Sequence, residues 1–557
     1  MSHKSELDTL VAALRSSLPR REVLKRAAAF GIGASSIAGA IATDSGVARA
    51  AARAALIAQE PVSGGELGIG IPIEPSILDP HVGSSRYDTV VLRMVFDSLV
   101  YRTDEGEFVP HLATSWETSE DGLTWTFMLR DDVTFHDGTP FNAEAAKISF
   151  DRMVNPDTAS QAAAGQLGPY ESSDVVDEFT LQMNFSAPFA SFLTNLSGVY
   201  LTPASPTAIE ELGADFGTNP VGTGPFRFVE WVPQSHIIIE RNPDYAWAPE
   251  GFHSGPAYLD GVRFTFIPEE SQRVAALETA QTDVILYAPA RDVALMTESG
   301  FGTEAIEVPG IAQVCIVNAA NGATADLPVR KAINHAINQQ TIIDVINEGV
   351  GQPLHNVISP GVWGYDPAMA EMYPHDPAKA AELLESAGWT GEGIRQKDGQ
   401  PLELLWIHFP NRTPGVPELV QGQLRDVGID MTIEALDNPG NMTRARAGEH
   451  NLEWMTWASL DPSIMRVLFH SENAGDGWNY AFYEDPELDE TLELIDTTID
   501  PDARLEHVQR AQQIIMEQGL VLPLQVDTNV VMWSPRTQNL KVAGFTPLLY
   551  DTYINEA

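Results

Sequence analysis

Residues 111–153 read HLATSWETSEDGLTWTFMLRDDVTFHDGTPFNAEAAKISFDRM and contain the clearest strand signal in the chain. In this stretch Leu123, Trp125, Phe127 and Leu129 are every second residue, which predicts a strand with one apolar face. The loop FHDG then leads from strand to helix. We expect His136, within that loop, to make a structural hydrogen bond rather than to bind a metal.

Further strands and helices alternate along the rest of the chain. Short apolar runs at 236–241, 262–267 and 402–409 predict strands. A helix is predicted between Asp376, which suits the N-cap, and Gly388, which suits the stop, with Pro377 at the first helical position. The same Asp-Pro start recurs at residues 485–486 and 500–501. Between Asp326 and Gly349 an apolar stripe with a spacing of four residues predicts one helix packed on a sheet.

Strands and capped helices are interleaved with no repeat period, which indicates an α/β or mixed α+β fold. The 557 residues suffice for two to four domains. No Pro/Gly/Ser-rich linker divides them, so we expect lobes that exchange segments rather than domains joined end to end.

The charge balance excludes one class of partner. The chain has 33 Lys and Arg against 77 Asp and Glu, a formal net charge of −44. Such a surface is unsuited to neutralising phosphates, so we expect no nucleic-acid partner.

The amino terminus has the pattern of an export signal. Arg20-Arg21 followed by Val23-Leu24-Lys25 is similar to the twin-arginine motif, and Ala27 to Ala42 are uncharged and small or apolar. Ala48-Arg49-Ala50 offers a cleavage site. We therefore expect a signal peptide over 1–50, a disordered lead-in over 51–64, and a protein that acts in the periplasm or outside the cell.

The rest of the chain predicts no membrane anchor. No other segment approaches 18 uncharged apolar residues, so we expect no transmembrane span. No cysteine lies near the cleavage site, which argues against a lipoprotein. The single cysteine, Cys315, lies in the apolar run IAQVCIV and is expected to be buried and inert.

The common catalytic and metal-binding motifs are absent from the sequence. It has no phosphate loop, H-E-x-x-H, G-x-S-x-G or calcium loop, and its 13 histidines form no local pair. Missing motifs leave an enzyme open, because catalytic triads also assemble from distant positions. No residue in the sequence favours one, however, and we expect no enzyme activity, no cofactor and no bound metal. The aromatic and polar segments 453–471 and 476–483 instead have the composition of a ligand-lined loop, with Trp454 and Trp457 the residues least typical of a core.

The chain resembles the family 5 extracellular solute-binding proteins of ABC importers, a group that includes dipeptide, oligopeptide and nickel binders. The resemblance runs from about Ile77 to Tyr550. It rests on residues 111–153 and on the ordered segments LDP (78–80), NPVGTGPFRF (219–228), AALETAQTD (275–283), VRKAINHAIN (329–338) and DPAKAAELLESAGW (376–389).

The resemblance implies a two-lobe periplasmic-binding-protein fold of type II, with strands crossing a hinge, a central ligand cleft and an extra subdomain. By this likeness the first lobe covers 60–85, 215–305 and 527–557. Residues 86–214 form the inserted subdomain, and 306–526 form the second lobe. This arrangement explains why no linker divides the domains, because the chain would cross the hinge more than once.

The resemblance also implies which residues touch the ligand. In the first lobe, the loop after the LDP strand matches Gly83, Ser84, Ser85, Arg86 and Tyr87. On the facing lobe the matching residues are Trp457, Ser459, Asp461, Trp478 and Asn479. We expect Arg86 or Arg412 to face a ligand carboxylate through a bidentate contact.

One position departs from the pattern of peptide-binding members. These often have an Asp, three residues before the Asp-Pro pair, that receives the α-amine of the peptide, and here that position is Ala458. A buried amine without a carboxylate is costly unless Asp461 or another acid compensates. The departure favours modified peptides or opine-like amino-acid conjugates.

The resemblance implies a monomeric receptor that captures a small peptide-like solute and delivers it to a permease and ATPase complex. A binder of nickel or of a metal chelate is the alternative within the family, weakened by the missing histidine cluster. A secreted phosphatase-like hydrolase is the alternative of another class, and the mature sequence lacks the clustered cations or metal ligands it needs. A chaperone-like or signalling receptor on the same scaffold is a third alternative.

Overall fold

The computed structural model describes residues 61–409 and 414–555. The predicted signal peptide, most of the predicted lead-in and Arg412 lie outside the described residues. Within the described part of the chain, no helix has the length and apolarity needed to cross a membrane.

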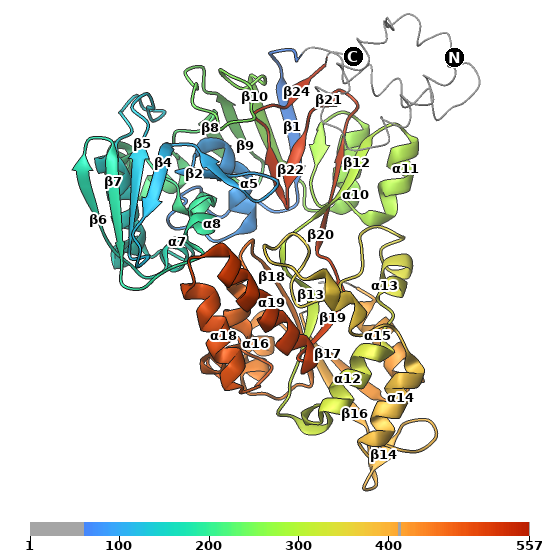
Figure 1. Cartoon of the computed structure of the whole chain (residues 1–557). Helices are drawn as coiled ribbons and strands as arrows, with labels where there is room; N and C mark the ends of the chain where they lie inside the picture. The colour runs from blue at the N-terminus through green and yellow to red at the C-terminus, as the bar shows by residue number, and fades with distance from the viewer. Residues whose placement is uncertain (1–60, 410–413, 556–557) are drawn as a thin grey trace, which may run out of the picture. The chain divides into compact units, whose positions relative to one another are not determined.

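A mixed seven-stranded sheet forms the centre of what we name the first lobe (Figure 1). Strand β1 lies in its middle and runs parallel to β10 and β11, whereas β9, β8, β20 and β12 pair antiparallel. The order across the sheet is β12 (Gly302–Glu307), β20 (Thr528–Trp533), β11 (Val284–Ile285), β1 (Glu66–Ile71), β10 (Gly261–Phe266), β9 (His236–Arg241) and β8 (Phe226–Val232).

Helix α5 (Arg86–Val95) follows the first strand of this sheet, and its first turn lines the larger cavity of the protein. Ser85 caps it by accepting from the Tyr87 N–H at 3.2 Å, and the helix buries Val90, Val91 and Met94. Gly224 lies against its carboxyl end, where a Cβ would stand 2.5 Å from the Met94 carbonyl oxygen. Only glycine permits this approach. Two further helices that belong to this lobe are α10 (Glu270–Glu278) and α11 (Val293–Glu298).

A four-stranded antiparallel sheet forms the inserted subdomain. Its order is β4 (Ala113–Thr118), β5 (Thr124–Leu129), β7 (Thr180–Phe185) and β6 (Tyr170–Asp177), and its helices are α6 (Ala143–Val154), α7 (Ala163–Leu167), α8 (Phe192–Leu196) and α9 (Pro206–Leu212). Trp125, Phe127 and Leu129 are buried on one face of β5, which confirms the alternation read from the sequence. The His136 Nε2 lies 2.9 Å from the Gly224 carbonyl oxygen, so its expected structural hydrogen bond is confirmed.

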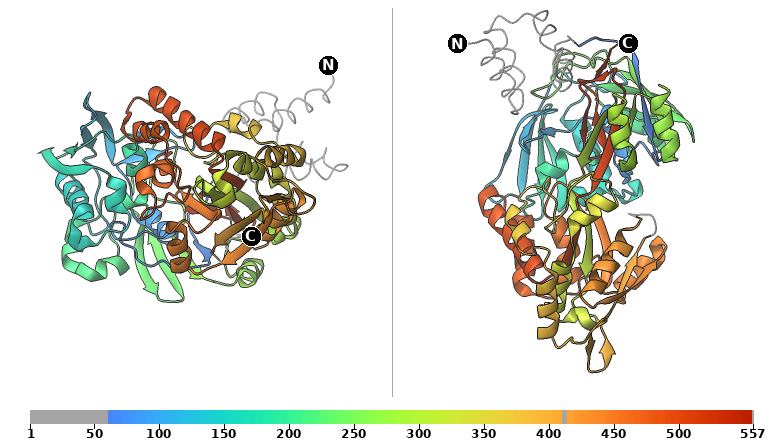
Figure 2. Two further views of the ribbon diagram at one scale, coloured as in Figure 1. Left: turned by 90° about the horizontal axis from the view of Figure 1, so that it is seen from below. Right: turned by 90° about the vertical axis from the view of Figure 1, so that its right-hand side faces the viewer.

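The second lobe is built on a five-stranded sheet with helices on both sides (Figure 2). Each face of the sheet carries a separate apolar core. The strand order is β17 (Asp430–Ala435), β16 (Glu403–His408), β18 (Leu452–Ala458), β13 (Gly310–Val317) and β19 (Val521–Gln525). One core includes α12 (Leu327–Ala336), α14 (Pro377–Ser386) and α15 (Val416–Asp426). The other includes α17 (Ile464–Phe469), α18 (Pro486–Thr497) and α19 (Pro501–Glu517).

Two sequence predictions in this lobe are wrong. The single helix expected between Asp326 and Gly349 is two helices, α12 and α13 (Gln339–Val345), because Ile337 is extended and the Asn338 side chain caps the second helix. Trp454 belongs to the core, where it is 2% exposed and stacks on Trp406 with ring centroids 6.0 Å apart, although it also borders the large cavity of this protein.

The expected helix caps and the expected state of the cysteine are confirmed. Asp376, Asp485 and Asp500 each accept a backbone N–H of the following helical turn at 2.9 Å. Cys315 is fully buried, and burial raises the pKa of its thiol well above the usual value.

The chain passes between the two large sheets at two places. β12 continues into β13 through Val308 and Pro309, and β19 continues into β20 through Val526 and Asp527. The two connections are joined, since the Val308 N–H donates to the Asp527 carbonyl oxygen at 2.9 Å. Gly310 follows the first connection with φ +147°, and a Cβ there would meet the Trp457 carbonyl oxygen at 2.1 Å.

Candidate ligand-binding site

A cavity of about 820 Å³ is lined by residues of both lobes. The first lobe and its subdomain contribute the start of α5, α7 and the turn at Phe545. The second lobe contributes β18, the helix α16 (Asn438–Arg446) and the segment around Trp478. Small-molecule sites usually enclose about 300–1,000 Å³, so this cavity has room for a ligand of several linked amino-acid units.

Aromatic rings form the wall supplied by the second lobe. Trp457 meets Trp478 edge to face, with ring centroids 5.2 Å apart and an interplanar angle of 84°. Tyr480 follows at 6.0 Å from Trp478. Arg446 lies over the face of Trp478, 5.8 Å from its centroid. Flat apolar surfaces of this kind supply contact area at little cost in side-chain entropy.

A carboxylate lies in the same wall. Glu453 lines the cavity although its residue is only 1% exposed, and it accepts from the Asn441 side-chain amide at 2.9 Å. Burial, and then the nearby Glu453 carboxylate, raise the pKa of Tyr480 to about 12. The phenol therefore stays protonated at neutral pH. The wall of the second lobe holds an acidic side chain, Glu453, and a basic one, Arg446, whose charge and hydrogen bond lower the pKa of Tyr480 in part.

The first lobe presents a cation to the same cavity. Arg86, the first residue of α5, places its guanidinium 5.5 Å from the centroid of Phe545. Burial alone would lower the pKa of Arg86, but the charges of Tyr287 and Asp527 outweigh it and raise the pKa. The side chain is therefore a permanent positive charge in the cavity.

Four of the residues implied by the family resemblance line this cavity: Ser84, Arg86, Trp457 and Trp478. Gly83, Ser85 and Tyr87, which the resemblance also implies, are not part of the lining. Ser85 caps α5, and the ring of Tyr87 lies against Tyr287 at 5.6 Å. Gly83 is buried, and its N–H donates to the Asp79 carbonyl oxygen at 2.9 Å.

Three further predicted residues lie beside the cavity rather than in its lining. Asp461 is 5% exposed and forms an ion pair with Arg504 at 2.7 Å. Ser459 donates its hydroxyl to the Asp461 carbonyl oxygen at 2.9 Å. Asn479 is fully buried and donates to the Phe469 carbonyl oxygen at 3.2 Å. In the structure these side chains stabilise the turns that follow β18.

Several lining residues were not singled out from the sequence: Glu453, Asn441, Tyr480 and Phe545. A signal existed for Glu453, because a charged residue inside the apolar strand LEWMTWA requires a special surrounding. No local signal exists for Phe545, which reaches the cavity from near the end of the chain.

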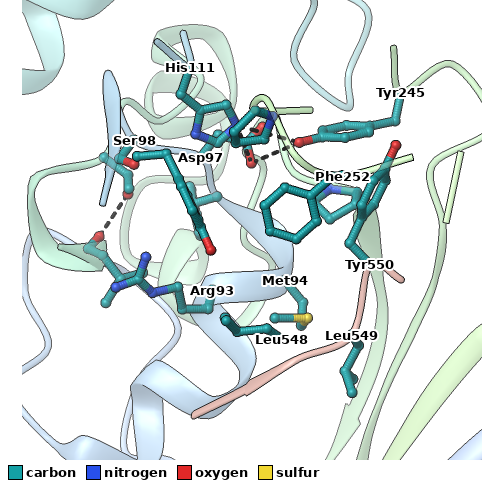
Figure 3. A pocket seen from close by; sticks show the side chains of 16 residues that line it. Arg93, Met94, Asp97, Ser98, His111, Tyr245, Phe252, Leu548, Leu549 and Tyr550 are labelled. Carbon is teal, nitrogen blue, oxygen red and sulfur yellow. Dashed lines mark hydrogen bonds and ion pairs between the residues drawn. The ribbon is translucent and has the colours of Figure 1, made fainter. Parts of the chain in front are cut away.

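A second, much smaller cavity of about 70 Å³ lies beside α5 (Figure 3). It is next to Asp97, whose carboxylate accepts from the Trp247 indole at 2.9 Å and the Thr223 hydroxyl at 3.2 Å. His111 is close to the same carboxylate, and burial lowers its pKa. The volume has room for a few water molecules and is too small for a peptide.

The described residues contain no group of three or more His, Cys, Asp or Glu side chains arranged to hold a metal ion. The candidate site is a cavity with aromatic walls, lined by an arginine, Arg86, from the first lobe and by a glutamate, Glu453, from the second.

Comparisons with known proteins agree with this architecture. The family model of the bacterial extracellular solute-binding proteins, family 5, matches residues 107–476. The glutathione-binding protein GsiB of Salmonella typhi is 29% identical over 480 residues, covering 83% of this chain and 88% of that protein.

Two solved structures extend the similarity to the fold. NikA from Brucella suis in complex with Fe(III)-EDTA has a TM-score of 0.78 and 26% identity, covering 88% of this chain and 100% of that one. DppA from Helicobacter pylori in complex with the peptide STSA has a TM-score of 0.71 and 27% identity, covering 89% and 99%. The expected two-lobe binding-protein fold of type II is confirmed. The chain belongs to the bacterial extracellular solute-binding proteins of family 5, the non-enzymatic receptors that serve ABC importers.

Proposed function

We propose that this protein captures a zwitterionic peptide or peptide-like amino-acid conjugate between its lobes and delivers it to a permease and ATPase complex. The observation that carries the proposal is that a basic and an acidic side chain line one cavity, with Arg86 on the first lobe and Glu453 on the second. The ligand carboxylate pairs with Arg86 and the ligand cation with Glu453. Glu453 thus supplies the acid that is missing at Ala458.

The relatives support this class of ligand. The similar protein of Salmonella typhi is named for binding glutathione, and the similar structure from Helicobacter pylori contains a tetrapeptide. Glutathione is itself a modified peptide with carboxylates and an amine, so it meets the same charge requirement. The contact residues within the proposed site are Ser84, Arg86, Trp457, Trp478 and Glu453, with Arg412, outside the described residues, as a further candidate.

A metal chelate is the second candidate ligand. The similarity to NikA with Fe(III)-EDTA favours it. A chelate of that kind is an anion and would pair with Arg86, while Glu453 would repel it.

The proposal includes the place of action and the state of the protein. The motif around Arg20-Arg21 supports export by the twin-arginine route, and the mature protein acts in the periplasm as a monomer without a lipid anchor. We retain the division into a first lobe (60–85, 215–305 and 527–557), an inserted subdomain (86–214) and a second lobe (306–526) as part of the proposal.

The test of ligand class is calorimetry and thermal denaturation of the mature protein with four probes: reduced glutathione, Met-Leu, Ser-Thr-Ser-Ala and Fe(III)-EDTA. Native mass spectrometry first identifies any molecule that co-purifies. A ligand at one hundred times its dissociation constant is expected to stabilise the protein by about 2.7 kcal/mol without being chemically changed. Binding of the chelate but of no peptide would replace the first candidate by the second.

The test of ligand orientation uses charge-deleted ligands. The wild-type protein is expected to prefer a free-amine peptide to its N-acetylated form, and Glu453→Gln to remove that preference. Arg86→Gln is expected to remove the preference for a free carboxylate over its amide. The exposed Glu484→Gln is the matched control and should change neither preference. Persistence of the amine preference in Glu453→Gln contradicts the assigned orientation.

A further inference from the structure

The two lobes meet at a second place that does not line the cavity. Ser191, immediately before α8 in the inserted subdomain, donates its hydroxyl to the Asp461 carboxylate at 2.9 Å. The Ser191 hydroxyl oxygen also accepts from the Arg504 guanidinium at 3.1 Å, and it lies 2.7 Å from the Ser463 hydroxyl oxygen. We name these four residues, Ser191, Asp461, Ser463 and Arg504, the junction.

The half of the junction in the second lobe is complete without Ser191. Arg504 binds Asp461 through two nitrogens, at 2.7 and 3.2 Å, and donates its Nε to the Ile495 carbonyl oxygen at 2.8 Å. Its guanidinium lies 5.2 Å from the centroid of Trp363. Burial alone would raise the pKa of Asp461, but Arg504 outweighs it and lowers the pKa. The carboxylate is thus a charged, prepositioned acceptor for a hydroxyl arriving from the other lobe.

The inserted subdomain and the second lobe also contact each other beside the junction. The Ala190 N–H donates to the Asp496 carbonyl oxygen at 2.9 Å. Gly122, in the turn between β4 and β5, lies so close to the second lobe that a Cβ would stand 3.0 Å from the side chain of Ile499. Ser191, Asp461 and Arg504 are 2%, 5% and 6% exposed, so water is excluded from these bonds.

A hydrogen bond to a buried charged pair is stronger than one between neutral groups, because the charge is poorly screened. The backbone connects the lobes at two neighbouring crossings, and the junction is made by the subdomain on one side and by α19 on the other. A hinge motion that separates the lobes would break the bonds of Ser191 while leaving the pair of Asp461 and Arg504 intact.

We propose that the junction is a latch that stabilises the closed arrangement of the lobes, with Ser191 as a positioning residue that raises ligand affinity without touching the ligand. The effect on affinity rests on the function proposed above, whereas the effect on closure does not. A ligand that favours the closed form gains affinity in proportion to the population of that form.

The first test measures closure without ligand. Spin labels are attached to cysteines introduced at Val176 on β6 and Ala378 on α14, both exposed, while the buried Cys315 is protected from labelling. Pulsed electron paramagnetic resonance then gives the ratio of closed to open molecules. Ser191→Ala is expected to lower this ratio about tenfold. An unchanged ratio, or a wild-type protein without a closed population, overturns the latch.

Ser149→Ala is the matched control. Ser149 is also a buried serine of the inserted subdomain, but its hydroxyl bonds are to Ala145 and Ala204 within the subdomain. It should lower the melting temperature and leave the closed-to-open ratio unchanged. An equal change of the ratio in both variants would assign the effect to loss of subdomain stability and overturn the proposal.

A second test locks the junction. In Ser191→Cys/Ser463→Cys, an oxidant is expected to form a disulfide, because the two hydroxyl oxygens lie 2.7 Å apart. The oxidised protein should show a single closed distance, and reduction should restore the open one. A distance distribution that does not respond to reduction means that these residues stay in contact in every state, which overturns the latch.

The affinity arm uses reduced glutathione and Met-Leu. If either ligand binds, Ser191→Ala should raise its dissociation constant about tenfold, because the ligand is released faster. If neither binds, the function proposed above fails for these ligands, while the resonance measurement still decides the latch.

Discussion

The cavity wall and the junction come from one short stretch of chain, yet their acidic side chains lie in different places. Glu453 and Trp457 on β18 line the cavity, whereas Asp461 and Ser463, only a few residues later, are buried in the junction. Asp461 binds the Arg504 guanidinium through two nitrogens and takes no part in lining the cavity, whereas Glu453 lines the cavity and accepts from the Asn441 amide. Under the two proposals above, these two nearby acids serve capture and closure separately.

The family pattern places both regions in one ligand-binding motif. The structure separates them, because the chain turns at Asp461-Pro462 and directs the second carboxylate toward α19. Variants of the junction are therefore expected to change stability, and variants of the wall to change affinity.

The largest expected effect is at the junction. Arg504→Met leaves the buried Asp461 carboxylate without its cation, and loss of one partner of a buried pair costs about 3–5 kcal/mol of unfolding free energy. Arg510→Met, on the same helix, breaks the exposed pair with Glu487 and should cost about 0–1 kcal/mol. Urea denaturation measures both, and similar losses would remove the contrast between the junction and the surface.

The next largest effect concerns the wall. Trp457→Ala removes a ring that packs on Trp478 in the cavity, and central aromatic contacts cost about 2 kcal/mol or more of binding, roughly thirtyfold in the dissociation constant. Trp231→Ala is the control, since this tryptophan is also half-buried but bonds Glu74 in the first lobe. Calorimetry with whichever probe binds measures the difference. Equal losses would contradict a binding role for the wall.

The smallest effect is the pH dependence of the junction. The pKa of Asp461 is lower in the folded protein than the unfolded value of about 3.9, because Arg504 outweighs the effect of burial. The ionised Asp461 carboxylate makes its full contribution to the unfolding free energy above the unfolded pKa. This contribution is lost as the pH falls through the lower pKa of the folded protein. The slope for one carboxyl is at most about 1.4 kcal/mol per pH unit.

Asp461→Asn should therefore have a flatter decline of stability than the wild type below pH 4, as followed by acid denaturation. The two proteins share every other titrating residue, but the Asp461 charge also raises the pKa of Asp496, so the difference in slope reports these two carboxyls together. Identical slopes would mean that the Asp461 carboxylate has the same pKa in the folded and unfolded chains.

Local sequence patterns predicted the elements well where the cause was local. The alternation in β5, the caps at Asp376, Asp485 and Asp500, and the buried Cys315 follow from neighbours within a few residues. The break at Ile337 was missed because the stripe of apolar residues continues across it, while the Asn338 cap starts a new helix.

The sequence by itself determined a mixed α and β fold, the family and a binding role, because periodicity, capping and ordered motifs are encoded in near neighbours. The tertiary structure alone decided that Arg86 and Phe545 meet at one cavity and that Asp461 faces Ser191, hundreds of residues away. Pairing of buried charges depends on which distant segments exclude water from them. That property arises only when the lobes pack together.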